Sequence, residues 1–319
     1  MDITRRSLLG TLSALLISSL VVACGGGQTT PTPSATPQQG VAASPTPTLA
    51  FPVTVTDFQG KSVVIPKRPE RIVAIGPSNT EYLFALGAGD RVVAVDDFSD
   101  EPPAAKAKEK IGGVKPNVEK IVALRSDLVV SLLISDGSLE RIAAQGIPVL
   151  VISPTGIADV SRTAVLLGTA IGADGAKLAS SIDEGLAAVR AQAASVPKKR
   201  VFHEVDASDP TKLFTAGPGS FIHELIELAG GINVAATAAS PFPQFSPEEI
   251  IHADPEVIVL GDAGYGVTVE QVRTRPGWSA ITAVRNGRIV PVDPNLMHRA
   301  GPRIVEAAEA YLRIIRETP

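Results

Sequence analysis

The sequence is short of the residues on which disulfide frameworks and most metal centres depend. Its 319 residues include one cysteine, which excludes an internal disulfide, and four histidines that are scattered along the chain. His223 opens a zinc-protease-like His-Glu pair, but the second histidine of that motif is missing. The chain also has no Gly-x-Ser-x-Gly nucleophile elbow, no phosphate-binding Gly-x-x-x-x-Gly-Lys and no Cys-x-x-Cys pair. We therefore expect no metal site, no cofactor and no covalent chemistry.

Aromatic residues and excess charge of one sign are scarce as well. Aromatics make up 4% of the chain, so a large flat ligand would have to rest on a handful of rings. The formal net charge of -4, without a basic patch, argues against nucleic acid as a partner. A hydrophobic content of 45% with 19% charged residues is typical of a soluble protein with a well-developed core. We expect a monomer with two domains of ordinary size.

The first 51 residues differ from the rest. Arg5 and Arg6 precede an apolar run that is too short for a comfortable membrane span, so residues 1–23 are predicted to be a secretory signal. The sequence Val-Val-Ala ahead of Cys24 resembles the lipobox of bacterial lipoproteins, which implies lipid attachment at Cys24; a buried free thiol is the alternative. Residues 24–51, rich in Pro, Thr and Ser, predict an extended tether. We expect an exported protein anchored at the outer face of the cell membrane, by Sec or twin-arginine export.

From residue 52 onward, strand-like and helix-like stretches alternate, which predicts mainly parallel sheets covered by helices. A hairpin with strands at 53–56 and 62–65 comes first. The predicted strands then cover 71–75, 92–95, 128–132, 149–152, 200–204, 214–216 and 257–260, and the predicted helices 80–86, 118–124, 138–145, 157–171 and 221–229. The stretch 174–196 has apolar residues at spacings of three and four, with Asp174 as a plausible cap and Pro197 as its stop. It is either a helix that connects two lobes or an ordinary amphipathic helix within one domain.

Two segments 129 residues apart follow one pattern. NVEKIVALRSDLVV, from Asn117, and SPEEIIHADPEVIV, from Ser246, both give a cap residue, a glutamate in the first helical turn and an apolar strand. A looser pair starts at Gly76 and Gly217, where a Gly-Pro turn opens a helix. The repetition favours two similarly built α/β lobes, over 52–173 and 197–319, with the helix 174–196 between them.

Several runs resemble a known family. RIVAIGPSNTEYLFALGAGDRVVAV, IGGVKPNVEKIVALRSDLVV, FTAGPGSFIHELIELAGG, FSPEEIIHADPEVIVL and HRAGPRIVEAA are similar to the substrate-binding proteins of bacterial ABC importers for cobalamin, ferric siderophores and haem, and closest to the cobalamin-binding member. The resemblance implies two Rossmann-like lobes joined by one long helix, a metal chelate held between them, and an importer permease with its ATPase as partners. A surface enzyme or chelatase on the same fold, or a ligand-sensing ectodomain, is the alternative function.

Ligand contacts are expected where the parallel strands end, since helix N-termini and turn amides meet there. The phenylalanines in those turns could also be core residues, whereas Arg299 matches the family's arginine in HRAGPR. Arg303 is expected to pair within its own lobe, and Trp278 to pack in the core. The candidate ligand-binding residues are Ser78, Asn79, Phe98, Lys115, Phe242, Phe245, Asn295 and Arg299.

Glu119 and Glu248 occupy equivalent positions in the two repeated segments. A carboxylate in a first helical turn is stabilised by the exposed N–H groups, which alone explains either residue. The resemblance implies a further role, because a glutamate at the top of each lobe docks on permease arginines in that family. The chain departs from the cobalamin-binding pattern in two places. It has Val114 and Lys115 after Gly112-Gly113, where that member has a tryptophan, and Phe98 where that member has a tyrosine. Lys115 with Arg299 would equally suit an anionic ferric chelate, so the sequence leaves the ligand open.

Overall fold

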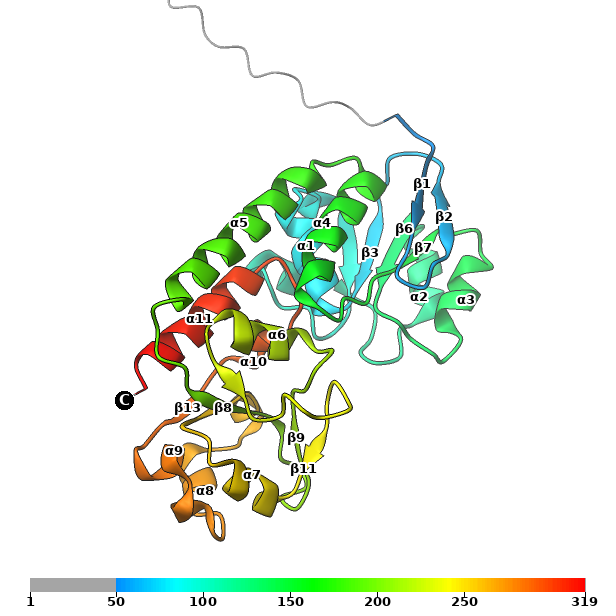
Figure 1. The fold of residues 1–319 in the computed structure, drawn as a ribbon. Helices are drawn as coiled ribbons and strands as arrows, with labels where there is room; N and C mark the ends of the chain where they lie inside the picture. The colour runs from blue at the N-terminus through cyan, green and yellow to red at the C-terminus, as the bar shows by residue number, and fades with distance from the viewer. Residues whose placement is uncertain (1–49, 319) are drawn as a thin grey trace, which may run out of the picture. The chain divides into compact units, whose positions relative to one another are not determined.

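The computed structural model describes residues 50–318 (Figure 1). The predicted signal, Cys24 and nearly all of the predicted tether lie outside this range. Within it, no helix combines the length and hydrophobicity needed to cross a bilayer.

The N-terminal sheet is fully parallel, with strand order β5-β4-β3-β6-β7. Its strands β3 and β6 lie at the centre and are buried along their whole length, as expected for a sheet covered on both faces. A separate antiparallel hairpin precedes it. The strands are β1 (Val53–Thr56), β2 (Ser62–Ile65), β3 (Ile72–Ile75), β4 (Val92–Val95), β5 (Glu109–Lys110), β6 (Leu128–Ser131) and β7 (Val149–Val151), and the helices are α1 (Pro77–Ala85), α2 (Val118–Ala123), α3 (Ser138–Ala143) and α4 (Ile157–Ile171), with short 3₁₀ turns at Gly89–Arg91 and Pro103–Ala107.

The C-terminal sheet is mixed, with order β11-β9-β8-β12-β13 and β10 pairing to β8. Strands β8, β12 and β13 run parallel, whereas β9 and β11 pair antiparallel. The strands are β8 (Arg200–Asp206), β9 (Leu213–Thr215), β10 (Ile232–Asn233), β11 (Gln244–Phe245), β12 (Val257–Leu260) and β13 (Ile289–Pro291), and the helices are α6 (Phe221–Leu228), α7 (Pro247–Ala253), α8 (Val269–Arg273), α9 (Thr282–Arg285), α10 (Pro294–Met297) and α11 (Ile304–Arg316), with 3₁₀ turns at Ala263–Tyr265 and Trp278–Ala280. Together the two sheets confirm the predicted two-lobed α/β fold.

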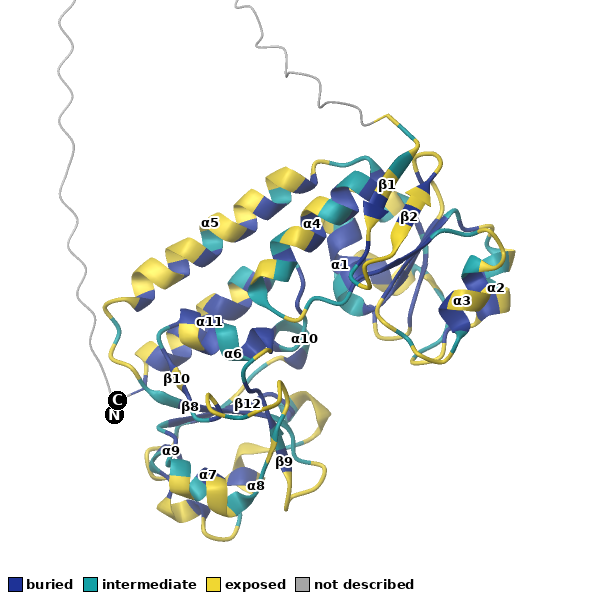
Figure 2. Ribbon diagram, turned by 45° about the vertical axis from the view of Figure 1, so that its right-hand side comes forward, coloured by how far each residue is buried: buried dark blue, intermediate teal, exposed yellow. Residues whose placement is uncertain are grey.

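Helix α5 (Gly175–Ala193) stands between the two sheets in the chain and packs against helices from both halves, α4 on one side and α6 and α11 on the other. The Asp174 side chain accepts a hydrogen bond from the Lys177 amide and so caps its start. One face is buried and the outward face is exposed (Figure 2). Packing against α4 is close: a Cβ atom added at Gly175 would lie 2.1 Å from the Ala164 carbonyl oxygen, so only glycine fits. The buried stripe consists of Ala179, Ile182, Leu186, Val189 and Ala193.

The largest hydrophobic cluster includes residues of α4, α5, α6 and α11 and extends to both sheets. The repeated segments occupy matching places beside it. Asn117 caps α2 and Ser246 caps α7, each with its side chain on a backbone amide, and the strands that follow, β6 and β12, are interior strands of their sheets. The looser pair differs, because β3 is a central parallel strand and β9 is antiparallel to β8. The predicted domain limits at 52, 173 and 197 stay predictions.

Candidate ligand-binding cleft

A cavity of about 750 Å³ lies between residues of the two halves. Its walls come from the turns that follow β3, β4, β6 and β7 on one side and from those that follow β12 and β13 on the other. These are the carboxyl ends of parallel strands, where open α/β sheets bind their ligands. The lining residues are Pro77, Ser78, Asp97, Phe98, Asp100, Leu132, Leu133, Ser153, Pro154, Thr155, Phe221, Tyr265, Pro294, Asn295, His298, Arg299 and Ala300.

Four of the eight predicted ligand residues line this cavity: Ser78, Phe98, Asn295 and Arg299. Phe98 is 55% exposed, and its ring lies against the Gly112-Gly113 turn, where a side chain at Gly113 would come within 3.3 Å of it. A large aromatic side chain exposed at a cleft is available for contact with a flat ligand.

The other four predicted residues do not line it. Asn79 is fully buried, and its Nδ2 donates to the Ile75 carbonyl, so it supports the β3–α1 turn from within. Lys115 is exposed outside the cavity wall. Phe245 is half-buried against the core of the C-terminal sheet, and Phe242 is exposed in the preceding loop. These four residues lie in or beside the predicted turns but do not line this cavity, and their role in ligand binding stays a prediction.

Several lining residues were missed from the sequence. Leu132 and Leu133 follow β6, and Tyr265, which is 75% exposed, follows β12. The rule that ligands bind at strand carboxyl ends would have found them, had it been applied to the apolar residues of those turns. With Phe98 they form an apolar rim on both sides of the cleft, and exposed apolar patches of this kind mark binding sites.

Arg299 is held by an ionic network that joins the two halves. Its Nη1 lies 2.8 Å from Oδ1 of Asp100 and 3.1 Å from Oε1 of Glu81, and its Nη2 donates to Oδ1 of Asn295 at 2.6 Å. Glu81 is 4% exposed and also receives a two-pronged contact from Arg303, at 2.8 and 2.9 Å. The prediction that Arg303 pairs within its own lobe is therefore wrong, because its fork matches a buried carboxylate on α1 in the N-terminal half.

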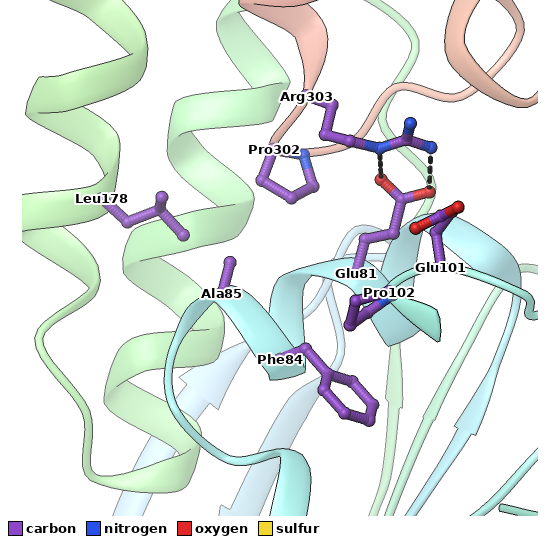
Figure 3. Close-up of a pocket in the computed structure, with 8 residues that line it drawn as sticks. All are labelled: Glu81, Phe84, Ala85, Glu101, Pro102, Leu178, Pro302 and Arg303. Atoms are coloured by element: carbon purple, nitrogen blue, oxygen red, sulfur yellow. Dashed lines mark hydrogen bonds and ion pairs between the residues drawn. The ribbon is translucent and has the colours of Figure 1, made fainter. Parts of the chain in front are cut away.

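Figure 3 shows Arg303 and Glu81 joined by this double contact in the wall of a second hollow of about 460 Å³. Phe84, Pro102, Leu178 and Pro302 supply its apolar surface, so it lies beside α1 and α5. The hydrogen bonds that Arg303 donates to Glu81 raise the pKa of Arg303 further above its usual value. The network thus runs from the cleft, which Arg299 and Asp100 line, to this hollow, which Glu81 and Arg303 line, and the charges of its two carboxylates and two guanidinium groups cancel.

A buried chain of polar side chains ends at the cleft. Nε2 of His298 lies 2.8 Å from Nε2 of His203, and Nδ1 of His203 lies 2.6 Å from the Tyr311 hydroxyl. Burial lowers the pKa of His298 to about 4, and burial followed by the neighbouring His298 lowers that of His203 well below its usual value. Burial raises the pKa of Tyr311 well above its usual range. All three groups are therefore neutral near pH 7.

Glu119 and Glu248 are both exposed in the first turns of α2 and α7. Neither carboxylate has a hydrogen bond or ion pair within residues 50–318, whereas the adjacent Glu249 is engaged in the capping box of Ser246. Across the same range, no group of three or more histidine, cysteine or acidic side chains is close enough to hold a metal ion. Trp278 is fully buried, stacked beneath the Arg275 guanidinium, as predicted for a core residue.

A sequence model of the periplasmic binding protein family matches residues 72–296. The chain belongs to this family. The uncharacterized ABC transporter substrate-binding lipoprotein YvrC of Bacillus subtilis is 34% identical to this binding protein over 310 residues, 94% of each chain. The vitamin B12-binding protein of Salmonella choleraesuis is 32% identical over 245 residues, 75% of this chain and 87% of its own. The chain is thus a substrate-binding protein of the ABC importer type.

Solved structures agree with the fold of this binding protein. The periplasmic heme-binding protein RhuT from Roseiflexus sp. RS-1, in its apo form, superposes with a TM-score of 0.71 at 28% identity, covering 78% of this chain and 98% of its own. The relatives are named as binding proteins, not as enzymes. Their names cover more than one kind of metal chelate.

Proposed function

We propose that this protein captures a corrinoid between its two lobes and delivers it to an ABC permease and its ATPase, without altering it. In this proposal the chain is exported and held at the outer face of the membrane by a lipid on Cys24, with residues 24–51 as a tether. The observation that supports the corrinoid best is the charge of the cleft, together with the vitamin B12-binding relatives.

Charge favours a ligand whose polar groups are neutral amides. The charged residues that line the cavity are Asp97, Asp100 and Arg299. Arg299 is the only cation among them, and Asp100 and Glu81 already neutralise it. Bringing a carboxylate or phosphate ligand against Asp97 would add repulsion without a free cation to offset it. Anionic haem and anionic ferric chelates are therefore disfavoured in this proposal, since Lys115 does not line the cavity beside Arg299.

Shape is consistent with the same ligand. The cavity lies within the range of about 300–1,000 Å³ that is usual for small-molecule sites, and its rim is apolar on both sides. Phe98 and Leu133 from one half and Tyr265 from the other can contact the faces and edges of a flat macrocycle. Each 100 Å² of apolar surface that such a contact removes from water contributes roughly 2–3 kcal/mol.

The test is a titration of the purified full chain with cyanocobalamin, haemin and a ferric hydroxamate, followed by tryptophan fluorescence and ligand absorbance. We expect saturable one-to-one binding of cyanocobalamin, at least tenfold tighter than that of the other two. Recovered ligand should be unchanged by mass spectrometry, since an altered product would favour the enzyme alternative. Tighter binding of haemin, or no binding of cyanocobalamin, would overturn the corrinoid proposal.

We further propose that Glu119 and Glu248 dock the protein on permease arginines. Two exposed carboxylates at equivalent turns of the two lobes, without partners among residues 50–318, can set orientation and association rate. Replacing both with alanine should leave ligand affinity unchanged and reduce uptake into proteoliposomes that contain the permease and ATPase. The matched control replaces Glu184 and Glu309, two exposed helix glutamates, with alanine. Equal uptake by the two double variants would remove the docking role, and uptake by neither wild type nor variants would favour a sensing ectodomain.

A further inference from the structure

The side chains of Tyr311, His203 and His298 form a continuous hydrogen-bonded chain in the C-terminal half. The two histidine rings meet edge to face, with centroids 5.1 Å apart, and His203 is completely buried. Gly261 makes this contact possible, because a Cβ atom there would lie 2.4 Å from Nε2 of His298 and 2.6 Å from Nε2 of His203. The far end of the chain, His298, lines the cleft. A buried polar chain that reaches a binding cavity can transmit a hydrogen-bonding preference to the ligand.

The direction of the hydrogen bonds follows from counting protons. A neutral imidazole carries one N–H, so one of its ring nitrogens donates and the other accepts. Since both rings are neutral, only one nitrogen donates in the contact between the Nε2 atoms of His203 and His298. The tautomer of each ring is then set by the hydrogen bond made at its other nitrogen.

Tyr311 decides between the two directions. Its hydroxyl is fully buried, and Nδ1 of His203 is its only hydrogen-bonding partner within residues 50–318. If His203 donated from Nδ1, the hydroxyl proton would have no acceptor, a penalty that corresponds to roughly 5- to 150-fold in population. The hydroxyl therefore donates to Nδ1 of His203, which carries its proton on Nε2 and donates to Nε2 of His298. His298 in turn must carry its proton on Nδ1.

This last N–H is open to the cleft. Nδ1 of His298 has no hydrogen-bond partner in the described part of the chain, and it is not among the buried polar atoms that lack one. It is therefore accessible to solvent, and the residue that bears it lines the cavity beside Arg299.

We propose that His298 binds an oxygen acceptor at the periphery of the ligand through a neutral Nδ1–H donor whose direction is fixed by Tyr311 and His203. The inference rests on the proposed function and names the ligand group that this residue reads, an amide carbonyl in the case of a corrinoid. It also assigns His298 no bond to the metal of the chelate. Metal binding would need a lone pair on Nδ1, and both tautomers would have to reverse and leave the Tyr311 proton without an acceptor.

The tautomers can be measured without any ligand. Long-range nitrogen–proton NMR spectra of the full chain labelled at histidine nitrogen should show His298 protonated on Nδ1 and His203 protonated on Nε2, with assignments from His298→Asn, His252→Gln and His223→Gln. Tyr311→Phe should remove the preference and give a mixture at both rings, provided that its thermal unfolding remains cooperative. Protonation of His298 on Nε2 in the wild type would overturn the inference.

Binding provides the second readout. Asparagine places an amide N–H where Nδ1 of histidine lies, so His298→Asn should bind cyanocobalamin within about threefold of wild type. His298→Leu, of similar bulk without a donor, should weaken binding about fivefold to tenfold, the usual effect of one neutral hydrogen bond. Unchanged binding by His298→Leu would overturn the ligand contact while the proposed function stands. Absence of cyanocobalamin binding in the wild type would overturn the proposed function and this contact, whereas the NMR result would still decide the direction of the chain.

Discussion

Replacing Glu81 with glutamine should destabilise the protein by about 2–4 kcal/mol. Removing one partner of a buried ion pair typically costs about 3–5 kcal/mol, because the remaining charge is left uncompensated. The Glu81 side chain is 4% exposed and that of Arg299 11%, but that of Arg303 is 27% exposed, so water screens part of the loss. The isosteric amide also turns an N–H₂ group toward one of the guanidinium groups, and only one of the two arginines keeps a carboxylate partner, Asp100.

Urea unfolding of the full chain at pH 7 measures this loss. The matched control is Glu270→Gln, which breaks a pair with Arg273 whose members are 65% and 73% exposed and should cost less than about 1 kcal/mol. A double variant, Glu81→Gln with Arg303→Gln, should be less destabilised than the sum of the single variants, since the two groups share one contact. If Glu81→Gln behaves like the exposed control, the network contributes little and the reasoning fails.

Two pH predictions have opposite signs. Because the pKa of His298 is lowered to about 4, the unfolded state takes up a proton first as pH falls from about 6.5. Between pH 7 and pH 4 the free energy of unfolding of wild type should therefore fall by about 1–3 kcal/mol more than that of His298→Asn. Burial and then the nearby Glu204 raise the pKa of Asp262 to about 6. The protonated Asp262 is therefore favoured in the folded state, and the stability that this gives at low pH is lost as pH rises through 6. Asp262→Asn retains an oxygen for the Ala207 amide. Between pH 4 and pH 7 its free energy of unfolding should therefore rise by about 1–3 kcal/mol relative to that of wild type. Urea unfolding across these ranges checks both, and a difference from wild type that does not vary with pH would contradict either.

The sequence predicted the elements better than the side-chain directions. The strands at 53–56, 62–65, 92–95 and 257–260 and the helix at 157–171 have the predicted limits, because apolar runs between Gly, Pro and cap residues are local signals. The mixed character of the C-terminal sheet was missed, since β9 and β11 are short and their direction depends on partners distant in the chain.

Four of the eight predicted ligand residues line the cavity, and the limit has the same cause. Which turns reach the cleft follows from strand direction, and Phe98 and Arg299 were found that way. Whether a side chain points into the cavity depends on one backbone turn, and so Asn79 is directed into the core. The partnership of Arg303 with Glu81 joins residues 222 positions apart, which no local pattern reveals.

We expect helix α5 and the Glu81 network together to leave the two lobes little freedom to part. The empty and loaded forms of this binding protein should then present nearly the same outline to a membrane partner. Recognition would depend on small changes at the rim, so unloaded molecules should occupy the importer and compete with loaded ones. A cell that made this protein in excess of its ligand would slow its own uptake, and the ratio of carrier to permease would become a quantity worth regulating.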